Sequence, residues 1–144
     1  MRTISGSCHC GNIRYEYLWP DAGSQIPVRA CSCTFCLKHG GVYTSHPDGQ
    51  LSAHIEEPNH VNPYSFGTKT AEFHICTICG AVPFVTSTIE GQQYAVVNVN
   101  TFEDVDKSNF TSSVTDFDDE DVESRLDRRK RKWTPRVEID YGPP

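Results

Sequence analysis

The sequence predicts a mainly β domain assembled from small sheets. Short runs rich in β-branched and aromatic residues recur along the 144 residues, and most of them end at Gly, Pro, Asn or Asp. Helical patterns are few by comparison. All seven cysteines fall in three close clusters, which is more typical of metal ligands than of disulfides in a reducing compartment. From the chain length we expect residues 1–144 to form a single domain.

The clearest strand runs from Ile13 to Trp19, where apolar and polar residues alternate with the two-residue period of a half-buried strand. A turn over Pro20–Gly23 follows it. The same reasoning predicts further short strands at Val42–Ser45, Leu51–Ile55, Tyr64–Phe66, Ala71–Ile75, Pro83–Thr88, Tyr94–Val99 and Val137–Tyr141.

Two segments have helical character. Thr34–His39 fits a helical turn, and Glu120–Lys132 fits a short charged helix. The second belongs to a highly charged segment at about residues 116–132, acidic at its start and basic at its end, which complements the dipole of a solvent-exposed helix. An alternative interpretation takes the basic run Arg128–Lys132 as a nuclear-import or nucleic-acid-binding patch.

The overall charge limits the classes of partner. A net charge of −6 argues against a surface built for nucleic acid, because such binding depends on many clustered cations. Apolar stretches such as Ala81–Val85 are far shorter than the roughly 20 residues of a membrane span. No apolar segment typical of a secretion signal precedes Cys8. We therefore expect a cytoplasmic protein with a small-molecule partner.

One set of four cysteines has the pattern of a closed metal site. Cys76 and Cys79 form a Cys-x-x-Cys pair followed by Gly80, a glycine that permits the positive φ angle of a tight metal-binding turn. Cys8 and Cys10 can supply two more ligands from another turn. Four thiolates of this kind predict a structural zinc site.

The other three cysteines, Cys31, Cys33 and Cys36, have no fourth cysteine. Zinc with three protein ligands keeps one position for water or substrate, which is the pattern of a catalytic site. One alternative is that His39 or His46 closes the site as a fourth ligand, and another is that these cysteines are redox-active or disulfide-paired.

The three clusters together carry a resemblance. The segments Gly6–Tyr15, Cys31–Cys36 and Cys76–Gly80 are similar to those of the glutathione-dependent formaldehyde-activating enzyme family, also called the centromere protein V domain family, and the similarity runs from about Ser5 to Asp106. The resemblance implies packed antiparallel sheets of the β-tent type. It also implies two zinc ions per chain, a structural one at the four-cysteine set and a catalytic one at Cys31, Cys33 and Cys36.

These observations predict a zinc-dependent lyase of the carbon–sulfur type. Its substrate would be the adduct of a thiol and a carbonyl compound, such as S-hydroxymethylglutathione, with glutathione or another thiol as partner. Related hydrolysis, epimerisation or adduct reactions on a small carbonyl metabolite suit the same site. His39, shortly after Cys36, is the candidate for proton transfer. The competing hypothesis is a zinc-stabilised protein- or chromatin-binding module without catalysis, anchored by Arg128–Lys132.

Overall fold

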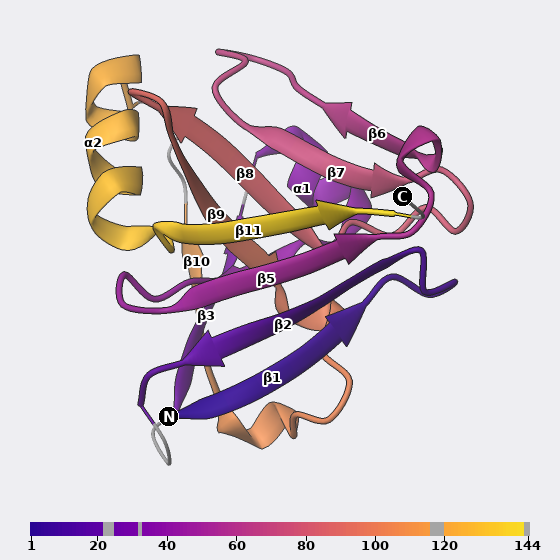
Figure 1. Ribbon diagram of the computed structural model, residues 1–144. Helices are drawn as coiled ribbons and strands as arrows, with labels where there is room; N and C mark the ends of the chain where they lie inside the picture. Colours follow the sequence, from indigo (N-terminus) through magenta and orange to yellow (C-terminus); the bar gives the residue numbers. More distant parts are fainter. Residues whose placement is uncertain (22–24, 32, 116–119, 143–144) are drawn as a thin grey trace.

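The computed structural model describes residues 1–21, 25–31, 33–115 and 120–142, which form two β-sheets and two α-helices (Figure 1). Residues 22 and 23 of the expected turn and residues 116–119 of the charged segment lie outside this description. About 47% of the chain is strand, so the mainly β class is confirmed. Neither α-helix combines the length and the apolar content that crossing a membrane requires, among the residues described.

The smaller sheet has one buried face. Its strands lie in the order β1-β2-β5-β11, with bounds Arg2–Ser7, Ile13–Trp19, Gln50–Ile55 and Arg136–Tyr141. In β2 the side chains of Ile13, Tyr15, Tyr17 and Trp19 are buried while those of Arg14 and Glu16 are exposed. The alternation predicted from the sequence therefore corresponds to a sheet that packs on one side only.

The larger sheet contains seven strands in the order β10-β3-β4-β9-β8-β7-β6. Their bounds are Phe110–Thr115, Ile26–Cys31, Val42–Thr44, Gln92–Asn98, Phe84–Ile89, Glu72–Cys76 and Val61–Tyr64. The helices are α1 (Thr34–His39) and α2 (Val122–Lys132), and short 3-10 turns occupy Pro58–His60, Val99–Thr101 and Lys107–Asn109. Helix α2 stands to one side of the sheets, against β8 (Figure 1).

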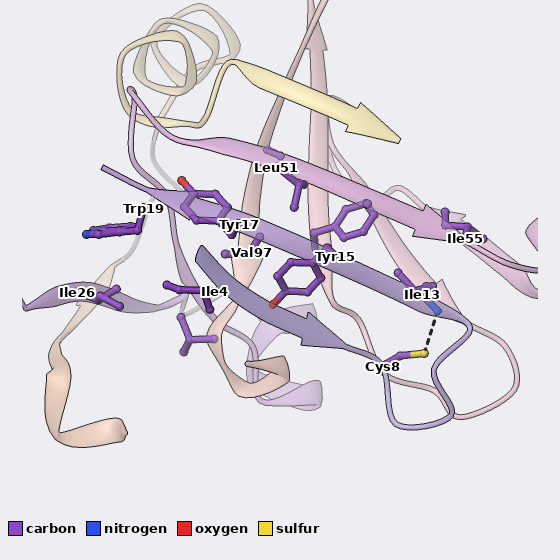
Figure 2. Packing of buried hydrophobic residues seen from close by; sticks show 14 of the residues in the cluster. Ile4, Cys8, Ile13, Tyr15, Tyr17, Trp19, Ile26, Leu51, Ile55 and Val97 are labelled. Atoms are coloured by element: carbon purple, nitrogen blue, oxygen red, sulfur yellow. Dashed lines mark hydrogen bonds between the residues drawn. The ribbon is translucent and has the colours of Figure 1, made fainter. Parts of the chain in front are cut away.

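Both faces of the larger sheet are covered. One face packs against the smaller sheet in a core that includes Tyr15, Leu51 and Val97 (Figure 2). The other face forms a second apolar cluster with α1 and the residues that follow α2, including Cys36 and Trp133. Successive side chains of a strand point to opposite faces, and here both faces are covered. The side chains of β8 and β9 are therefore buried almost continuously rather than alternately.

Most of the expected elements are present, with specific differences. The strand expected at Tyr64–Phe66 lies earlier, at Val61–Tyr64, and the sequence reasoning missed β1, β3 and β10. The sheets are mixed rather than purely antiparallel, because β10 pairs in parallel with β3 and β11 pairs in parallel with β5. Each parallel partner is distant in sequence, as parallel pairing requires a long connection.

The hydroxyl of Tyr17 connects the smaller sheet to segments that lie outside it. It accepts a hydrogen bond of 2.9 Å from the backbone N–H of His46 and forms a further hydrogen bond with Thr134 Oγ1. We expect Tyr17→Phe to lower the free energy of unfolding by about 1–2 kcal/mol, because buried polar partners lose a hydrogen bond. Urea unfolding measures this value. Tyr141→Phe, on the exposed Tyr141 of β11, is the matched control and should change it little; equal effects of the two substitutions would contradict the assignment.

Candidate metal centres and the adjoining cavity

Four cysteines from the two sheets converge at one point. Cys8 and Cys10 lie in the turn between β1 and β2 of the smaller sheet, and Cys76 and Cys79 lie at the end of β7 in the larger sheet. Their four sulfur atoms lie within 4.8 Å of one another. The Cys8–Cys10 sulfur distance is 3.7 Å and the Cys10–Cys76 distance is 3.5 Å. Tetrahedral zinc with bonds of about 2.3 Å holds its sulfurs about 3.8 Å apart, so the set fits zinc.

Local backbone geometry prepares this site. Gly11 and Gly80 have φ angles of 85° and 83°, and each backbone N–H closes a turn by donating to the carbonyl of Cys8 or Cys76. The Gly80 conformation is the one that the sequence motif predicted. The N–H of Ile13 also donates to Cys8 Sγ at 3.3 Å (Figure 2). Such donors stabilise a sulfur that carries negative charge.

The acid–base behaviour of the four thiols suits a cation. Burial and, to a smaller extent, the neighbouring cysteine side chains together raise the pKa of Cys8 to about 12. Burial also raises the pKa of Cys79, but backbone hydrogen bonds from Ala81 and Cys10 outweigh this effect and lower it to about 6. Crowded thiols resist joint ionisation unless a positive ion compensates their charge. The donor set therefore matches a metal that binds thiolates.

The second group comprises Cys31 at the end of β3 together with Cys33 and Cys36 at the start of α1. Their sulfurs also lie within 4.8 Å of one another, and no histidine, aspartate or glutamate among the described residues joins this set. The structure therefore does not bring His39 or His46 in as the fourth ligand. All seven cysteines are free, which also argues against the disulfide alternative.

Helix α1 shapes the three-cysteine group. Cys33 is its N-cap, and Cys33 Sγ accepts a hydrogen bond of 3.4 Å from the backbone N–H of Cys36. The helix ends at Gly40, whose φ of 75° suits a left-handed cap. Hydrogen bonding to Cys31 and burial both raise the pKa of Cys36, as expected for sulfurs held together without compensating charge.

A cavity of about 410 Å³ opens beside these three cysteines. This volume falls in the range of pockets that hold small molecules. The second face of the larger sheet forms its floor, and the loop between β6 and β7 and helix α2 form its sides. Its aromatic and aliphatic lining comes from Tyr43, Phe66, Phe73, Val85, Val96 and Trp133. The four-cysteine group, by contrast, contributes nothing to this lining.

The basic run Arg128–Lys132 is divided between two environments. Arg128 and Arg129 line the cavity, whereas Arg131 and Lys132 are exposed. Lys130 Nζ forms an ion pair of 2.8 Å with Glu90. The binding-module hypothesis requires one continuous solvent-facing anchor, and this run does not form one. Sequence reasoning missed its role in the cavity, since the positions of the two neighbouring arginines depend on how α2 packs.

In the structure the side chain of Tyr43 connects His39 to Cys36. His39 Nε2 lies 3.1 Å from the hydroxyl of Tyr43, and that hydroxyl lies 3.9 Å from Cys36 Sγ. Burial lowers the pKa of His39 and raises that of Tyr43, so at neutral pH both are uncharged. Tyr43 lines the cavity and His39 does not. The sequence singled out His39, whereas in the structure Tyr43 is the one of the two that contacts a cysteine sulfur and lines the cavity.

Other histidines have structural partners. His74 is buried, its Nε2 lies 2.8 Å from Thr86 Oγ1, and burial lowers its pKa to about 4. His46 Nε2 lies 3.1 Å from Asp21, and its Nδ1 accepts a hydrogen bond from the N–H of Asp48. These contacts account for both side chains without a role at the three-cysteine group.

Comparison with known proteins agrees with these features. The family model described as "Glutathione-dependent formaldehyde-activating enzyme" matches residues 3–119. A curated relative from Halomonas elongata, named "Putative glutathione-dependent formaldehyde-activating enzyme", is 28% identical over 89 residues. That alignment covers 57% of this chain and 55% of the relative, so the chain matches just over half of the relative's length.

A solved structure shares the fold. The crystal structure of a Rhodobacter sphaeroides protein covers 74% of this chain and 99% of its own, with a TM-score of 0.53 and 24% sequence identity. Helix α2 begins at Val122, beyond the residues that the family model matches.

The two cysteine groups should differ in their effect on stability. We expect Cys76→Ala to remove one zinc ion and unfold the chain, because a structural zinc contributes about 10 kcal/mol or more to folding. Cys36→Ser should remove the other zinc ion and leave the chain folded. The three-cysteine group joins β3 and α1, which are neighbours along the chain. Metal analysis by plasma mass spectrometry, paired with thermal melting, measures both effects. Equal unfolding of the two variants would show that the division into two kinds of site is wrong.

Proposed function

The chain belongs to the glutathione-dependent formaldehyde-activating enzyme family, and from this premise we propose that it is a zinc-dependent enzyme of the carbon–sulfur lyase type. Its reaction would make or break the adduct of a thiol and a small carbonyl compound, with S-hydroxymethylglutathione as the model substrate. The relative's name supports this choice of glutathione and formaldehyde.

The observation that carries the proposal is the place of the three-cysteine group. Cys31, Cys33 and Cys36 all line the cavity and present three sulfurs without a fourth protein ligand among the described residues. Zinc held by these sulfurs would supply an exchangeable coordination position that binds and orients a thiol or carbonyl oxygen. A purely structural site would have four protein ligands and no need of a cavity.

The proposed reaction forms or breaks one carbon–sulfur bond and transfers one proton. In the forward direction the thiol sulfur bonds to the carbonyl carbon, the carbonyl π bond breaks, and the proton from sulfur ends on the resulting hydroxyl oxygen. The reverse direction restores both reactants. No oxidant or reductant takes part, which agrees with the redox inertness of zinc.

Tyr43 is the protein group best placed to handle this proton. Tyr43 lines the cavity, and its hydroxyl contacts both Cys36 Sγ and His39 Nε2. A neutral imidazole can accept a hydrogen bond from this hydroxyl and so hold it in one orientation. We therefore assign proton transfer to Tyr43 and the positioning of Tyr43 to His39, in place of direct catalysis by His39.

The direct test uses magnetisation exchange in proton NMR between hydrated formaldehyde and S-hydroxymethylglutathione. The zinc-loaded chain should accelerate this exchange above the uncatalysed rate. Cys36→Ser should abolish the acceleration while the chain remains folded by circular dichroism. An identical exchange rate with and without the zinc-loaded chain would overturn the proposal.

Tyr43→Phe tests the proton-transfer role. The substitution removes the hydroxyl and keeps the aromatic ring, so we expect turnover to fall by about 100-fold, the scale of general acid–base catalysis. Zinc content should stay unchanged. Tyr94→Phe is the control, because Tyr94 is also largely buried but does not line the cavity. A fall of similar size in both variants would point to general damage and against this role.

A further inference from the structure

The part of the cavity wall that carries positive charge consists of four arginines. Arg29 comes from β3, and Arg125, Arg128 and Arg129 come from α2. We call these four residues the arginine wall. Three of them lie beyond residues 3–119, the part of the chain that matches the family model.

Two members of the wall have a carboxylate partner. Glu120, which also lines the cavity, lies 3.5 Å from Arg125 Nε and 3.0 Å from Arg128 Nη2. Hydrogen bonding from Arg128 lowers the pKa of Glu120, so the carboxylate is ionised at neutral pH. Glu120 therefore contacts two of the four guanidinium groups.

Among the described residues, the hydrogen-bond partners of Arg129 are neutral groups. This arginine is 8% exposed, and its Nη1 donates to the carbonyl oxygen and hydroxyl of Thr70 and to Ser87 Oγ. Its guanidinium carbon lies 4.9 Å from the ring centre of Trp133. Its Nε is buried and has no hydrogen-bond partner among the described residues. Buried charged donors normally have partners, so this group requires an explanation.

Arg29 also lacks a carboxylate partner among the residues that the structure describes. Its Nη2 donates to Ser45 Oγ at 3.1 Å, and the neighbouring Arg128 adds electrostatic repulsion. Burial lowers the pKa of Arg29 and lowers that of Arg129 to about 10, yet both remain cationic at neutral pH. Two positively charged residues thus line the cavity, and no ion pair joins either of them to a carboxylate of the described residues.

We propose that the arginine wall binds the carboxylate or phosphate oxygens of the substrate while its reacting end lies at Cys31, Cys33 and Cys36. The substrate class is then a small thiol or carbonyl compound that carries an oxyanion. Guanidinium groups suit this task because their planar N–H donors match the oxygen geometry of carboxylate and phosphate. The inference rests on the proposed function in one respect, that the three cysteines mark the reaction centre.

The aromatic lining fits such a ligand. Phe66, Phe73 and Trp133 form an apolar surface in the same cavity as the arginine wall and the cysteines. An apolar wall excludes water and strengthens the attraction between guanidinium and oxyanion. A compound with an anionic end and a short organic body would use both kinds of surface at once.

Binding experiments test this inference without turnover. Isothermal titration of the zinc-loaded chain would use three probes: S-methylglutathione, inorganic phosphate and benzoate. S-methylglutathione has no free thiol to bind the metal, so its affinity reports on the cavity wall. Tightest binding of inorganic phosphate would indicate a preference for phosphate. Tightest binding of S-methylglutathione or benzoate would indicate a preference for carboxylate. For S-methylglutathione, conversion of its carboxylates to methyl esters should weaken binding by at least about tenfold.

Arg129→Gln should weaken binding of the tightest probe by about tenfold or more, because one charge-assisted contact is lost. Arg131→Gln removes the same charge from an exposed position of α2 and should leave affinity within about twofold. Since Arg129 also packs against Trp133, Arg29→Gln provides a second variant on a different element, with the same expected loss. Circular dichroism checks that each variant is folded.

Three results would overturn the inference: no binding of any of the three probes at millimolar concentration, equal affinity for acid and ester, or equal losses from Arg129→Gln and Arg131→Gln. The NMR exchange assay stays separate. Arginine-dependent binding without exchange activity would remove the proposed reaction and leave the anion site. Exchange activity without arginine-dependent binding would remove the anion site and leave the proposed reaction.

Discussion

The convergence of four sulfur atoms from two sheets is the constraint on which the rest of the molecule depends. Cys8 and Cys10 belong to the hairpin of β1 and β2, whereas Cys76 ends β7 of the other sheet and Cys79 follows it. Their approach fixes one end of the core in which Tyr15 and its neighbours pack (Figure 2). Four thiols at these distances repel one another once ionised. A bound cation would compensate this repulsion and cross-link the two sheets.

The larger sheet separates stability from chemistry by the alternation of its strands. In β9, Ala95 and Val97 belong to the core between the sheets, whereas Val96 between them lies in the second cluster and lines the cavity. In β8 the same division separates Phe84 from Val85. A side chain on one face can therefore change without creating a void on the other. The cavity face has strands beneath it and the β6–β7 loop and helix α2 at its sides.

The local parts of this arrangement are readable from the sequence, and the long-range parts are not. Alternation identified β2, and the Cys-x-x-Cys-Gly motif identified a cysteine pair that joins the four-sulfur group and the positive φ of Gly80. The missed strands β3 and β10 pair in parallel at the edge of the larger sheet, although about 80 residues separate them. Pro27 obscured β3, because proline is disfavoured inside a strand, whereas Arg29 lies at an alternate position of the strand and lines the cavity. The place of Tyr43 in the cavity could not be predicted, because a tyrosine on a short strand has no motif that separates a site residue from core packing.

Helix α2 shows why a charge pattern alone is ambiguous. Its N-cap Asp121 and its basic last turn satisfy the helix dipole, so the sequence of the helix is fully consistent with a solvated surface element. Packing on Trp133 and Thr70 nevertheless turns Arg129 inward, while Arg131, two residues further along, remains in solvent. A helix period of 3.6 residues places such neighbours on different faces, so one basic run can serve both solubility and recognition. The sulfur ligands come from the segment that the family shares, and three of the four cavity arginines come from the segment beyond it. If the proposed reaction and anion site hold, the reaction centre and the selection of its substrate belong to separate parts of the chain, and a change in α2 would alter the second without touching the first.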